Sequence, residues 1–575
     1  MGSVLSCDAR SACAGASEGV EAERVAGPAA ETVPILRRLG QHAAAGLARA
    51  VVETGRKCDR VTCSYSELLA NVQRNSQTVA CLLEERGAGL PKHVAYVVNP
   101  SIAYAVIELS VWAAGAACVP LSVHSPQPEL EYFVEDSEAA LLIADEASAE
   151  KLRPVAAKLG RPLAIVSCKA GALSYAIAAE QPSSAAVAQA GTDVSMDSNA
   201  LILYTSGTTG KPKGVVHTFA SLSAQYASLS EAWKWSSQDY TLHVLPLHHI
   251  HGVQNILNTA LYNGAGVEFT PFDAGFCLER LSSGDITCFH AVPTVYVKFT
   301  QHLDRLDIAE RSKIEQGMRN PSMRYMVSGS AALPVPTMQS WATISGHVLL
   351  ERYGMTEIGM GLSNKIDGTR YPGCVGWALP GVDVKCDSDG AILIKGPALF
   401  KEYYRKEDAT KKEFTEDGWF KTGDSCQVGG SAVELQSIHD DARAVEEATG
   451  RPSLQLSSQP APELGSIYKI MGRSSVDIIK SGGYKISALE IESVLLQHAK
   501  IKECAVVGKP DATWGEKVTA VCVLDGDLSV QELREWGKER MASYKVPQDL
   551  EPVTLLPRNQ MGKIEKKKIL DQYKS

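Results

Sequence analysis

The 575-residue sequence lacks several features that would place it in a specialised class of protein. Its fourteen cysteines form no C-x-x-C pair, which argues against a zinc site or a dense disulfide framework and favours free thiols in a reducing compartment. Lys and Arg number 57 against 66 Asp and Glu, and a formal net charge of −9 argues against nucleic-acid binding. The most apolar stretch, residues 103–121, contains Glu108 and Pro120, so we expect a buried helix that runs into a strand there, not a membrane span.

Alternation of two hydrophobic patterns indicates the fold class. The sequence predicts strands at residues 93–98, 140–144 and 162–166 and a helix at residues 65–86. This alternation is typical of an α/β protein with layered β-sheets and covering helices. We expect a large N-terminal domain at residues 34–470, joined by a hinge to a small α+β lid domain at residues 471–575. Residues 429–462, rich in Ser, Gln, Gly and Pro, indicate an insertion beside that hinge.

Residues 1–33 have the composition of a disordered leader. The first six residues match the M-G-x-x-x-[ST] pattern for myristoylation at Gly2, and Cys7 offers a second acylation site, so weak membrane association through an acylated N-terminus is one expectation. An unmodified tail is the alternative. Four acidic residues between positions 8 and 23 make the leader unlike a typical mitochondrial transit peptide. We therefore expect a cytoplasmic protein, with membrane tethering or a mitochondrial location as alternatives.

A loop rich in glycine and threonine carries the strongest chemical signal. A buried apolar strand ends at Tyr204 and a second strand starts at Gly214. Glycines between them let the backbone approach closely, hydroxyls donate hydrogen bonds and lysines add positive charge, so the loop suits a polyphosphate. It is not a Walker A loop, because Gly207 and Gly210 are three apart and Pro212 follows the lysine. The expected phosphate-binding residues are Thr205, Ser206, Gly207, Thr208, Thr209, Gly210, Lys211 and Lys213.

Residues that suit a nucleotide recur further along the chain. Asp424 presents two acceptor oxygens for ribose hydroxyls, and Arg473 adds a fixed fork of donors. Tyr353 offers a flat face for a purine. Thr356 and Glu357 are hard oxygen donors suited to Mg²⁺ that is shared with phosphates. Each residue taken alone is more typical of a loop, a core position or a helix start, so the order of the motifs decides their interpretation.

That order resembles the adenylate-forming superfamily, which includes acyl-CoA synthetases, luciferases and peptide-synthetase adenylation domains. The resemblance extends over at least residues 60–570 and implies an enzyme that uses ATP, Mg²⁺ and coenzyme A and forms an acyl-AMP intermediate. It implies that Glu357 and Thr205 bind magnesium. The nucleotide-binding residues that it implies beyond the loop are Gly329, Ser330, Ala331, Tyr353, Gly354, Met355, Asp424 and Arg473. Thr356, Glu357, His249 and Lys563 are the expected catalytic residues.

The resemblance also implies a lid with two orientations. Lys563 lies between an expected strand at residues 552–556 and an expected helix at residues 565–573. In the family this lysine enters the cleft and stabilises the charge that develops when a carboxylate attacks a phosphate. A Gly-Gly bend would present its backbone to pantetheine in the second orientation, although a purely structural turn is the alternative. The expected CoA-contacting residues are Lys480, Ser481, Gly482, Gly483 and Lys485.

Within the superfamily, the segments 246–252, 327–333, 350–360 and 475–485 look most like malonyl-CoA synthetases, so malonate is the expected acid and methylmalonate the next. A dicarboxylate keeps one carboxylate unreacted, and burying it requires a cationic partner. We assign this role to Arg324 with His249 beside it. The alternatives are a structural role for Arg324 and a position in the wall of the acyl pocket for His249.

Two other functions are weighed against this interpretation. A medium- or long-chain fatty acyl-CoA synthetase, or an acyl-AMP ligase that loads a carrier protein, would share the same nucleotide motifs. An idle scaffold protein on this fold would be expected to have lost Lys563, Glu357 or Asp424, and all three are present. The expected partners are therefore small molecules: ATP, CoA and a short dicarboxylic or fatty acid.

Overall fold

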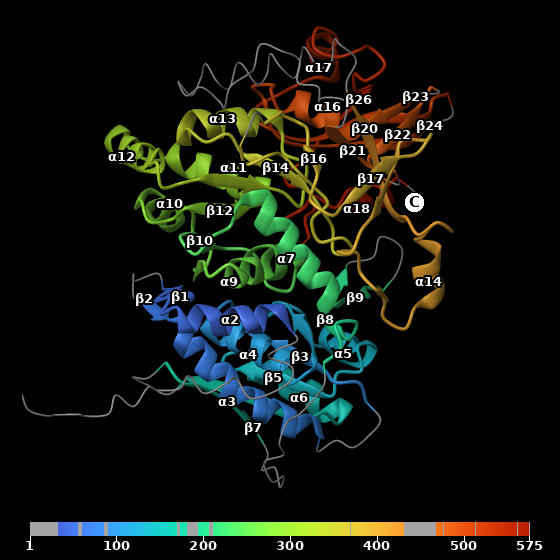
Figure 1. Ribbon diagram of the computed structural model, residues 1–575. Helices are drawn as coiled ribbons and strands as arrows, with labels where there is room; N and C mark the ends of the chain where they lie inside the picture. The colour runs from blue at the N-terminus through green and yellow to red at the C-terminus, as the bar shows by residue number, and fades with distance from the viewer. Residues whose placement is uncertain are drawn as a thin grey trace, which may run out of the picture.

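A computed structural model of the chain describes residues 33–55, 60–84, 90–168, 173–180, 194–205, 211–367, 370–429, 467–474, 476–482, 484–511, 513–559 and 562–573. The leader with Gly2 and Cys7, most of the expected insertion, the loop residues 206–210 and Gly483 lie outside the described residues. The described residues form a large N-terminal domain and a smaller C-terminal domain (Figure 1).

The first of two large sheets has nine strands in the order β16-β15-β14-β13-β12-β10-β11-β1-β2. Its strands are β1 (Val51–Thr54), β2 (Arg60–Cys63), β10 (Tyr240–His243), β11 (Gly266–Phe269), β12 (Cys288–Ala291), β13 (Tyr325–Ser328), β14 (Leu350–Tyr353), β15 (Leu362–Ser363) and β16 (Trp377–Ala378). Neighbouring strands from β1 to β14 along this order run parallel. Ligands bind at the carboxyl ends of such strands, so the ends of β13 and β14 are the places to look for a site.

The second sheet has eight strands in the order β19-β9-β8-β4-β3-β5-β6-β7. Its strands are β3 (His93–Val97), β4 (Ala117–Leu121), β5 (Leu141–Asp145), β6 (Leu163–Cys168), β7 (Tyr175–Ala179), β8 (Asn199–Thr205), β9 (Lys213–Thr218) and β19 (Glu402–Tyr403). β3 and β4 are buried along their whole length, as expected for parallel strands covered on both faces. The strands predicted near residues 93, 140 and 162 are confirmed as β3, β5 and β6.

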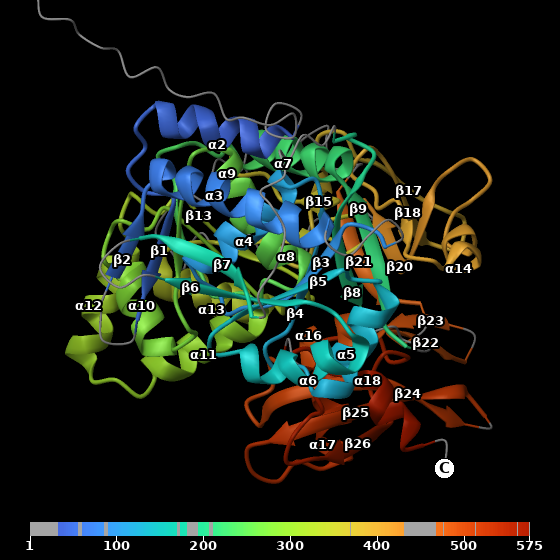
Figure 2. The same cartoon turned by 90° about the horizontal axis from the view of Figure 1, so that it is seen from below.

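Helices cover both sheets and fill the space between them (Figure 2). The helices are α2 (Pro34–Ala44), α3 (Tyr65–Glu84), α4 (Ile102–Ala113), α5 (Gln127–Asp136), α6 (Ala149–Leu159), α7 (Phe219–Trp233), α8 (Ile250–Gly252), the π-helix η1 (Val253–Asn258), α9 (Thr259–Tyr262), α10 (Ala274–Ser282), α11 (Pro293–Leu303), α12 (Ile308–Met318), α13 (Val335–Ser345) and α14 (Glu407–Lys412). One hydrophobic core joins α4, α7 and α9 to residues of both sheets. Two further cores pack α10–α13 on the outer face of the first sheet and α5 and α6 on that of the second. The layered α/β architecture and the buried helix–strand unit expected at residues 103–121 are confirmed.

A smaller four-stranded sheet leads to the C-terminal domain. It contains β17 (Asp383–Cys386), β18 (Ala391–Lys395), β20 (Phe420–Val428) and β21 (Tyr468–Arg473), in that order. Val428 pairs with Tyr468 across β20 and β21, so the described residues on either side of the expected insertion lie next to each other. β21 crosses the domain boundary predicted at residues 470/471 and ends at Arg473.

The C-terminal domain, which we call the lid, has a five-stranded sheet with helices beside it in the residues that the structure describes (Figure 1). They are β22 (Ile478–Ser481), β23 (Tyr484–Ser487), β24 (Ile501–Asp511), β25 (Gly515–Leu524), β26 (Asp549–Pro552), α16 (Ala488–Leu495), α17 (Val530–Lys538) and α18 (Lys566–Asp571). The strand predicted at residues 552–556 is wrong, because β26 ends at Pro552 and Leu556 turns inward to a small hydrophobic cluster.

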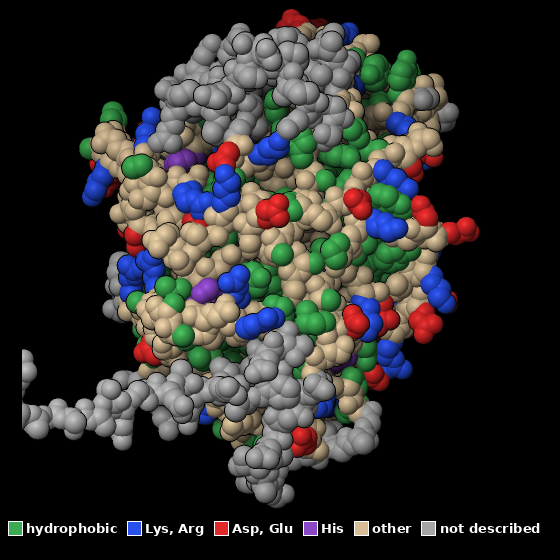
Figure 3. Space-filling model, in the orientation of Figure 1, with side chains coloured by type: hydrophobic (Ala, Val, Ile, Leu, Met, Phe, Trp, Pro, Cys, Tyr) green, Lys and Arg blue, Asp and Glu red, His purple; other side chains and the backbone are tan. Residues whose placement is uncertain are grey.

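A disulfide joins Cys386 to Cys426, so the expectation of free thiols is wrong for this pair. The sequence offers no signal for it, because the two cysteines are 40 residues apart. Within the described residues, no helix combines the length and apolar character needed to cross a membrane. Acidic and basic side chains are interspersed over the face shown in Figure 3.

Candidate active site

The ends of the glycine-rich loop are anchored, although residues 206–210 lie outside the described residues. Thr205 closes β8, and its hydroxyl donates to the carbonyl of Lys213 at 3.4 Å. The ammonium of Lys211 lies 5.2 Å from the ring centre of Tyr132, whose hydroxyl donates to the carbonyl of Pro212 at 2.7 Å. Tyr132, on α5, was not anticipated from sequence, where it looks like an ordinary aromatic of an amphipathic helix. Lys211 and Lys213 therefore both lie at the end of the loop that we expect to bind a polyphosphate.

Lys213 belongs to a cluster that reaches the Thr356-Glu357 motif. Its ammonium lies 3.7 Å from the ring centre of Tyr403, and the Tyr403 hydroxyl donates to the Glu357 carboxylate at 2.9 Å. Burial raises the pKa of Glu357. The structure thus brings a candidate magnesium-binding carboxylate next to a candidate phosphate-binding lysine.

His217, on β9, connects this cluster to the turn after β14. It was not predicted as a site residue from the sequence. Burial lowers the pKa of His217 to about 4, so the imidazole is neutral. Its Nε2 donates to the carbonyl of Thr356 at 2.7 Å. The hydrogen bond holds the turn after β14 against the strand that follows the glycine-rich loop.

Two tight turns follow the carboxyl ends of β13 and β14, where the site was expected. Ser330 has a left-handed backbone with φ of 66° and turns the chain after β13. Gly354 begins the turn after β14, and a Cβ there would lie 2.2 Å from the carbonyl oxygen of Gly359, so only glycine fits. The structure therefore brings the two expected nucleotide turns together at one sheet edge.

Asp424 and Arg473 face Tyr353 at the same edge. The Tyr353 hydroxyl donates to the Asp424 carboxylate at 2.5 Å, and Arg473 Nε lies 3.4 Å from the other carboxylate oxygen. Asp424 is only 7% exposed, and burial raises its pKa while Arg473 opposes that shift. Asp424 pairs directly with Arg473 between β20 and β21, which explains how residues 49 positions apart meet.

Lys563 of the lid lies in this cleft. Its loop is closed by hydrogen bonds with Asn559, from the Lys563 amide to Asn559 Oδ1 at 3.0 Å and from the Asn559 amide to the Lys563 carbonyl at 2.9 Å. Burial lowers the pKa of Lys563 to about 8, with further lowering by Arg473 and Arg352 and an opposing effect from Asp424. Arg473, Arg352 and Asp424 belong to the N-terminal side of the nucleotide cleft, so the C-terminal domain contributes Lys563 to this cleft in the structure.

His249 also faces this cleft, just before α8. Burial is the main cause of its strongly lowered pKa, and His248 and Lys563 lower it further. The neutral imidazole of His249 is therefore close enough to Lys563 for the ammonium to lower its pKa. Within the part of the chain that the structure describes, no group of three or more His, Cys, Asp or Glu side chains could hold a metal ion.

The assignment of Arg324 to the acid pocket is wrong. Arg324 precedes β13 and so lies at the amino end of the strand, opposite the turn at Ser330. It forms an ion pair with Asp239 and donates to the carbonyls of Trp233 and Lys234 at 3.2 and 3.0 Å. These partners satisfy its guanidinium, so Arg324 has the structural role that was its alternative.

A second arginine, Arg352 on β14, lies at the carboxyl end of the sheet, beside the turn at Ser330. It is 3% exposed, and its Nη2 donates to the Ser330 hydroxyl at 3.2 Å. His251 Nδ1 lies 3.0 Å from the same hydroxyl. None of the described residues provides a partner for Arg352 Nε, for His251 Nε2 or for either ring nitrogen of the buried His290. An arginine inside an otherwise buried strand just before Tyr353 was the available sequence signal.

The expected CoA-contacting residues that the structure describes lie on a hairpin of the C-terminal domain. β22 and β23 form the predicted hairpin, with Lys480 paired to Lys485 and Ser481 to Tyr484. Gly482 has a φ of 56° and lies against the ring of Trp514, where a Cβ would come within 3.1 Å. The Lys485 ammonium lies 3.5 Å from Asp389 in the turn between β17 and β18.

The fold, with its glycine-rich loop between β8 and β9 and its lid lysine in the cleft, defines an enzyme that binds a nucleotide. The chain belongs to the family of AMP-binding enzymes: the AMP-binding enzyme model matches residues 41–404, and the model of the C-terminal domain of these enzymes matches residues 490–563. The use of ATP and coenzyme A is implied by this family.

Several relatives cover most of the chain. The mitochondrial malonate–CoA ligase of Mus musculus is 39% identical over 517 residues, which covers 84% of this chain and 82% of that protein. The malonate–CoA ligase of Arabidopsis thaliana is 38% identical over 506 residues, covering 83% of this chain and 77% of that protein. Among solved structures, ATP-bound MatB from Rhodopseudomonas palustris matches with a TM-score of 0.72 at 30% identity and covers 92% of this chain and 96% of its own.

Proposed function

We propose that this chain is an ATP-dependent malonate–CoA ligase. The carboxylate of malonate attacks the α-phosphorus of ATP, and pyrophosphate leaves. The CoA thiol then attacks the acyl carbon of malonyl-AMP, and AMP leaves as the thioester forms. The malonate–CoA ligases among the relatives support this acid, and the match to the AMP-binding enzyme model supports the adenylate route.

The observation that carries the choice of acid is the buried guanidinium of Arg352, whose Nε has no partner among the described residues. A cation buried without a carboxylate partner is costly, and pairing with a substrate anion removes that cost. Ser330 and His251 add hydrogen-bonding groups beside it. We assign this pocket to the carboxylate of malonate that does not react. A medium- or long-chain fatty acid would place its alkyl chain there, beside a buried cation, so the pocket argues against that alternative.

The chain's own residues account for the adenylation step. Lys211, Lys213 and the glycine-rich loop bind the phosphates, and Tyr353, Asp424 and Arg473 hold the nucleoside. Lys563 stabilises negative charge between the attacking carboxylate and the α-phosphate. Thr205 and Glu357 fit Mg²⁺, because they are hard oxygen donors beside the phosphate lysines, and the ion would neutralise phosphate charge when bound.

The lid orientation supports a two-step use of the cleft. At the same 30% identity, ATP-bound MatB gives a TM-score of 0.72, whereas a malonyl-CoA ligase product complex with methylmalonyl-CoA and AMP gives 0.55. We infer that this structure has the adenylation orientation and that thioester formation needs the lid to turn. In that second orientation, Lys480, Ser481, Gly482, Gly483 and Lys485 would contact CoA.

The vertebrate relatives are named as mitochondrial enzymes, which favours the mitochondrial alternative over the cytoplasmic expectation. Acylation at Gly2 and Cys7 stays a prediction, and metabolic labelling with a clickable myristate analogue tests it.

Malonamate tests the proposed acid sharply, because it has the size of malonate but an uncharged amide in place of the free carboxylate. We expect the wild-type enzyme to prefer malonate, and Arg352→Met to reduce kcat/KM for malonate about 10²- to 10³-fold, as loss of a buried charge partner does. Malonamate turnover should change little in the same variant. Equal use of malonate and malonamate by the wild-type enzyme would contradict the assignment.

A further inference from the structure

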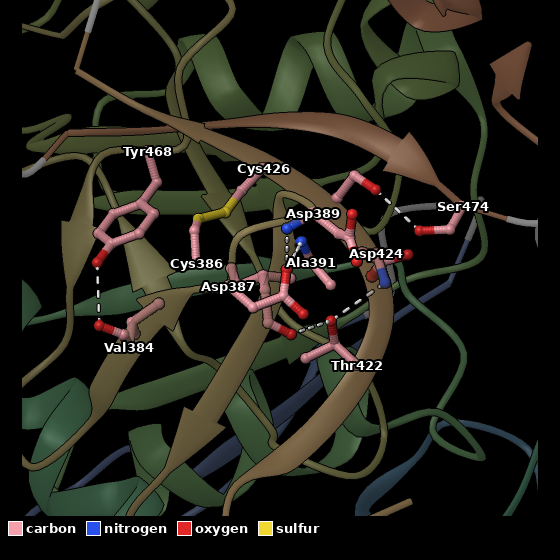
Figure 4. Close-up of a disulfide and its surroundings, with 12 residues drawn as sticks. Val384, Cys386, Asp387, Asp389, Ala391, Thr422, Asp424, Cys426, Tyr468 and Ser474 are labelled. Atoms are coloured by element: carbon pink, nitrogen blue, oxygen red, sulfur yellow. Dashed lines mark hydrogen bonds between the residues drawn. A yellow bond between two sulfur atoms is a disulfide. The ribbon is translucent and has the colours of Figure 1, made fainter. Parts of the chain in front are cut away.

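The disulfide between Cys386 and Cys426 lies beside the nucleotide cleft (Figure 4). It joins β17 to β20, two strands that are separated in the sheet by β18. Cys426 is two residues after Asp424, and both lie on the buried face of β20 together with Thr422. The covalent bond therefore ends on the same strand face as the carboxylate that we assign to ribose.

The backbone ladder around Asp424 is interrupted on both sides. Towards β18 the register shifts between Ala391 and Leu393, and towards β21 it shifts between Ser425 and Cys426. Such bulges disrupt regular pairing locally. Hydrogen bonds from the Cys426 amide to the Gly390 carbonyl at 2.8 Å and between the Ser425 and Ser474 hydroxyls at 2.8 Å remain. The disulfide therefore restrains β20 where its regular backbone pairing with β18 and β21 is interrupted.

Cys386 differs in access from most other cysteines among the described residues. Cys386 is partly exposed, whereas Cys426 is buried. By contrast, burial raises the pKa of the Cys63, Cys277 and Cys522 thiols to about 12, 11 and 12, so they are protonated and poorly reactive. An incoming thiolate can therefore reach Cys386 while these core thiols stay inert.

We propose that Cys386 and Cys426 are a redox modification site that controls ATP binding through the strand that carries Asp424. The proposal rests on the nucleotide role of Asp424 given above. A dithiol reductant attacks the sulfur of Cys386, and Cys426 leaves as a thiolate and takes up a proton. The second thiol of the reductant then attacks the mixed disulfide, which releases Cys386 as a thiol and leaves the reductant oxidised to its disulfide. The protein gains two electrons and two protons, and the reductant loses the same number.

The oxidised chain binds ATP more tightly, because the restrained strand holds Asp424 in place for ribose. We expect reduction with dithiothreitol to raise the dissociation constant for ATP about 3- to 10-fold, the factor that corresponds to one hydrogen bond. Calorimetric titration with ATP measures it, and peptide mapping without reduction shows whether residues 386 and 426 are linked. Both readouts work without any acid substrate, so a failure of malonate turnover would count against the proposed function alone.

Three variants complete the test. Cys386→Ser should match the reduced wild-type chain and ignore dithiothreitol, whereas Cys81→Ser, at a half-buried cysteine of α3, should keep the full response. Asp424→Ala should weaken ATP binding in both redox states; if it does not, the nucleotide role of Asp424 is wrong. Three results would overturn the redox proposal: no disulfide after treatment with oxidised glutathione, equal ATP affinity of the oxidised and reduced wild-type chain, or a response to dithiothreitol that persists in Cys386→Ser.

Discussion

Lys563 offers the most specific prediction, because its environment sets both its role and its pH dependence. Its pKa is lowered to about 8 by burial and then by Arg473 and Arg352. The protonated form is the one that stabilises the developing charge, so adenylation should be constant below pH 7 and fall as the pH rises through 8. At pH 9 about a tenth of the free enzyme keeps the proton, so kcat/KM for ATP should drop about tenfold between pH 7 and pH 9.

The assay is malonate-dependent exchange of labelled pyrophosphate into ATP, which reports adenylation alone. Lys563→Ala should lose about 10²- to 10³-fold in this exchange, the usual loss for a preorganised charge stabiliser. It should still form the thioester from preformed malonyl-AMP and CoA. Lys563→Arg keeps its charge at high pH and serves as the control, with a flat profile up to pH 9. Near-normal exchange by the alanine variant, or the same alkaline fall in the arginine variant, would refute the role of Lys563.

Three other variants separate effects on binding from effects on stability. Tyr353→Phe removes the hydroxyl that donates to Asp424 and should raise KM for ATP about tenfold with kcat little changed, and an unchanged KM would show that the hydroxyl does not position Asp424. Lys566→Met removes an ammonium that lies 2.6 and 2.7 Å from two buried carboxylates, so the free energy of unfolding in urea should fall by about 3–5 kcal/mol. Lys568→Met on the same helix removes an exposed ion pair and should cost less than about 1 kcal/mol, and equal losses in the two variants would contradict this reasoning.

Much of the fold could be predicted because the relevant signals are local. Periodicity located β3, β5 and β6, and apolar runs on either side of the glycine-rich loop located β8 and β9. The candidate nucleotide residues follow an ordered series of short motifs, and the structure brings Tyr353, Asp424, Arg473 and Lys563 to one cleft. Each of these motifs carries its own chemical signature in a few adjacent residues.

The contacts that could not be predicted from the sequence depend on the direction of a strand and on which strands are neighbours in the sheet. Arg324 directly precedes β13 and Arg352 lies on β14, and only the strand direction shows that Arg324 lies at the amino end. Asp239, 85 residues away, is the partner that removes Arg324 from the acid pocket. The pairing of Cys386 with Cys426 likewise arises from the order of β17, β18 and β20 in the sheet. No short motif encodes such contacts.

The measurement that tests the account most directly is product analysis of one reaction with ATP, malonate and CoA. The account predicts AMP, pyrophosphate and malonyl thioester in equal amounts, with no AMP formed when malonate is left out. Formation of ADP and inorganic phosphate, or AMP that accumulates without malonate, would contradict it.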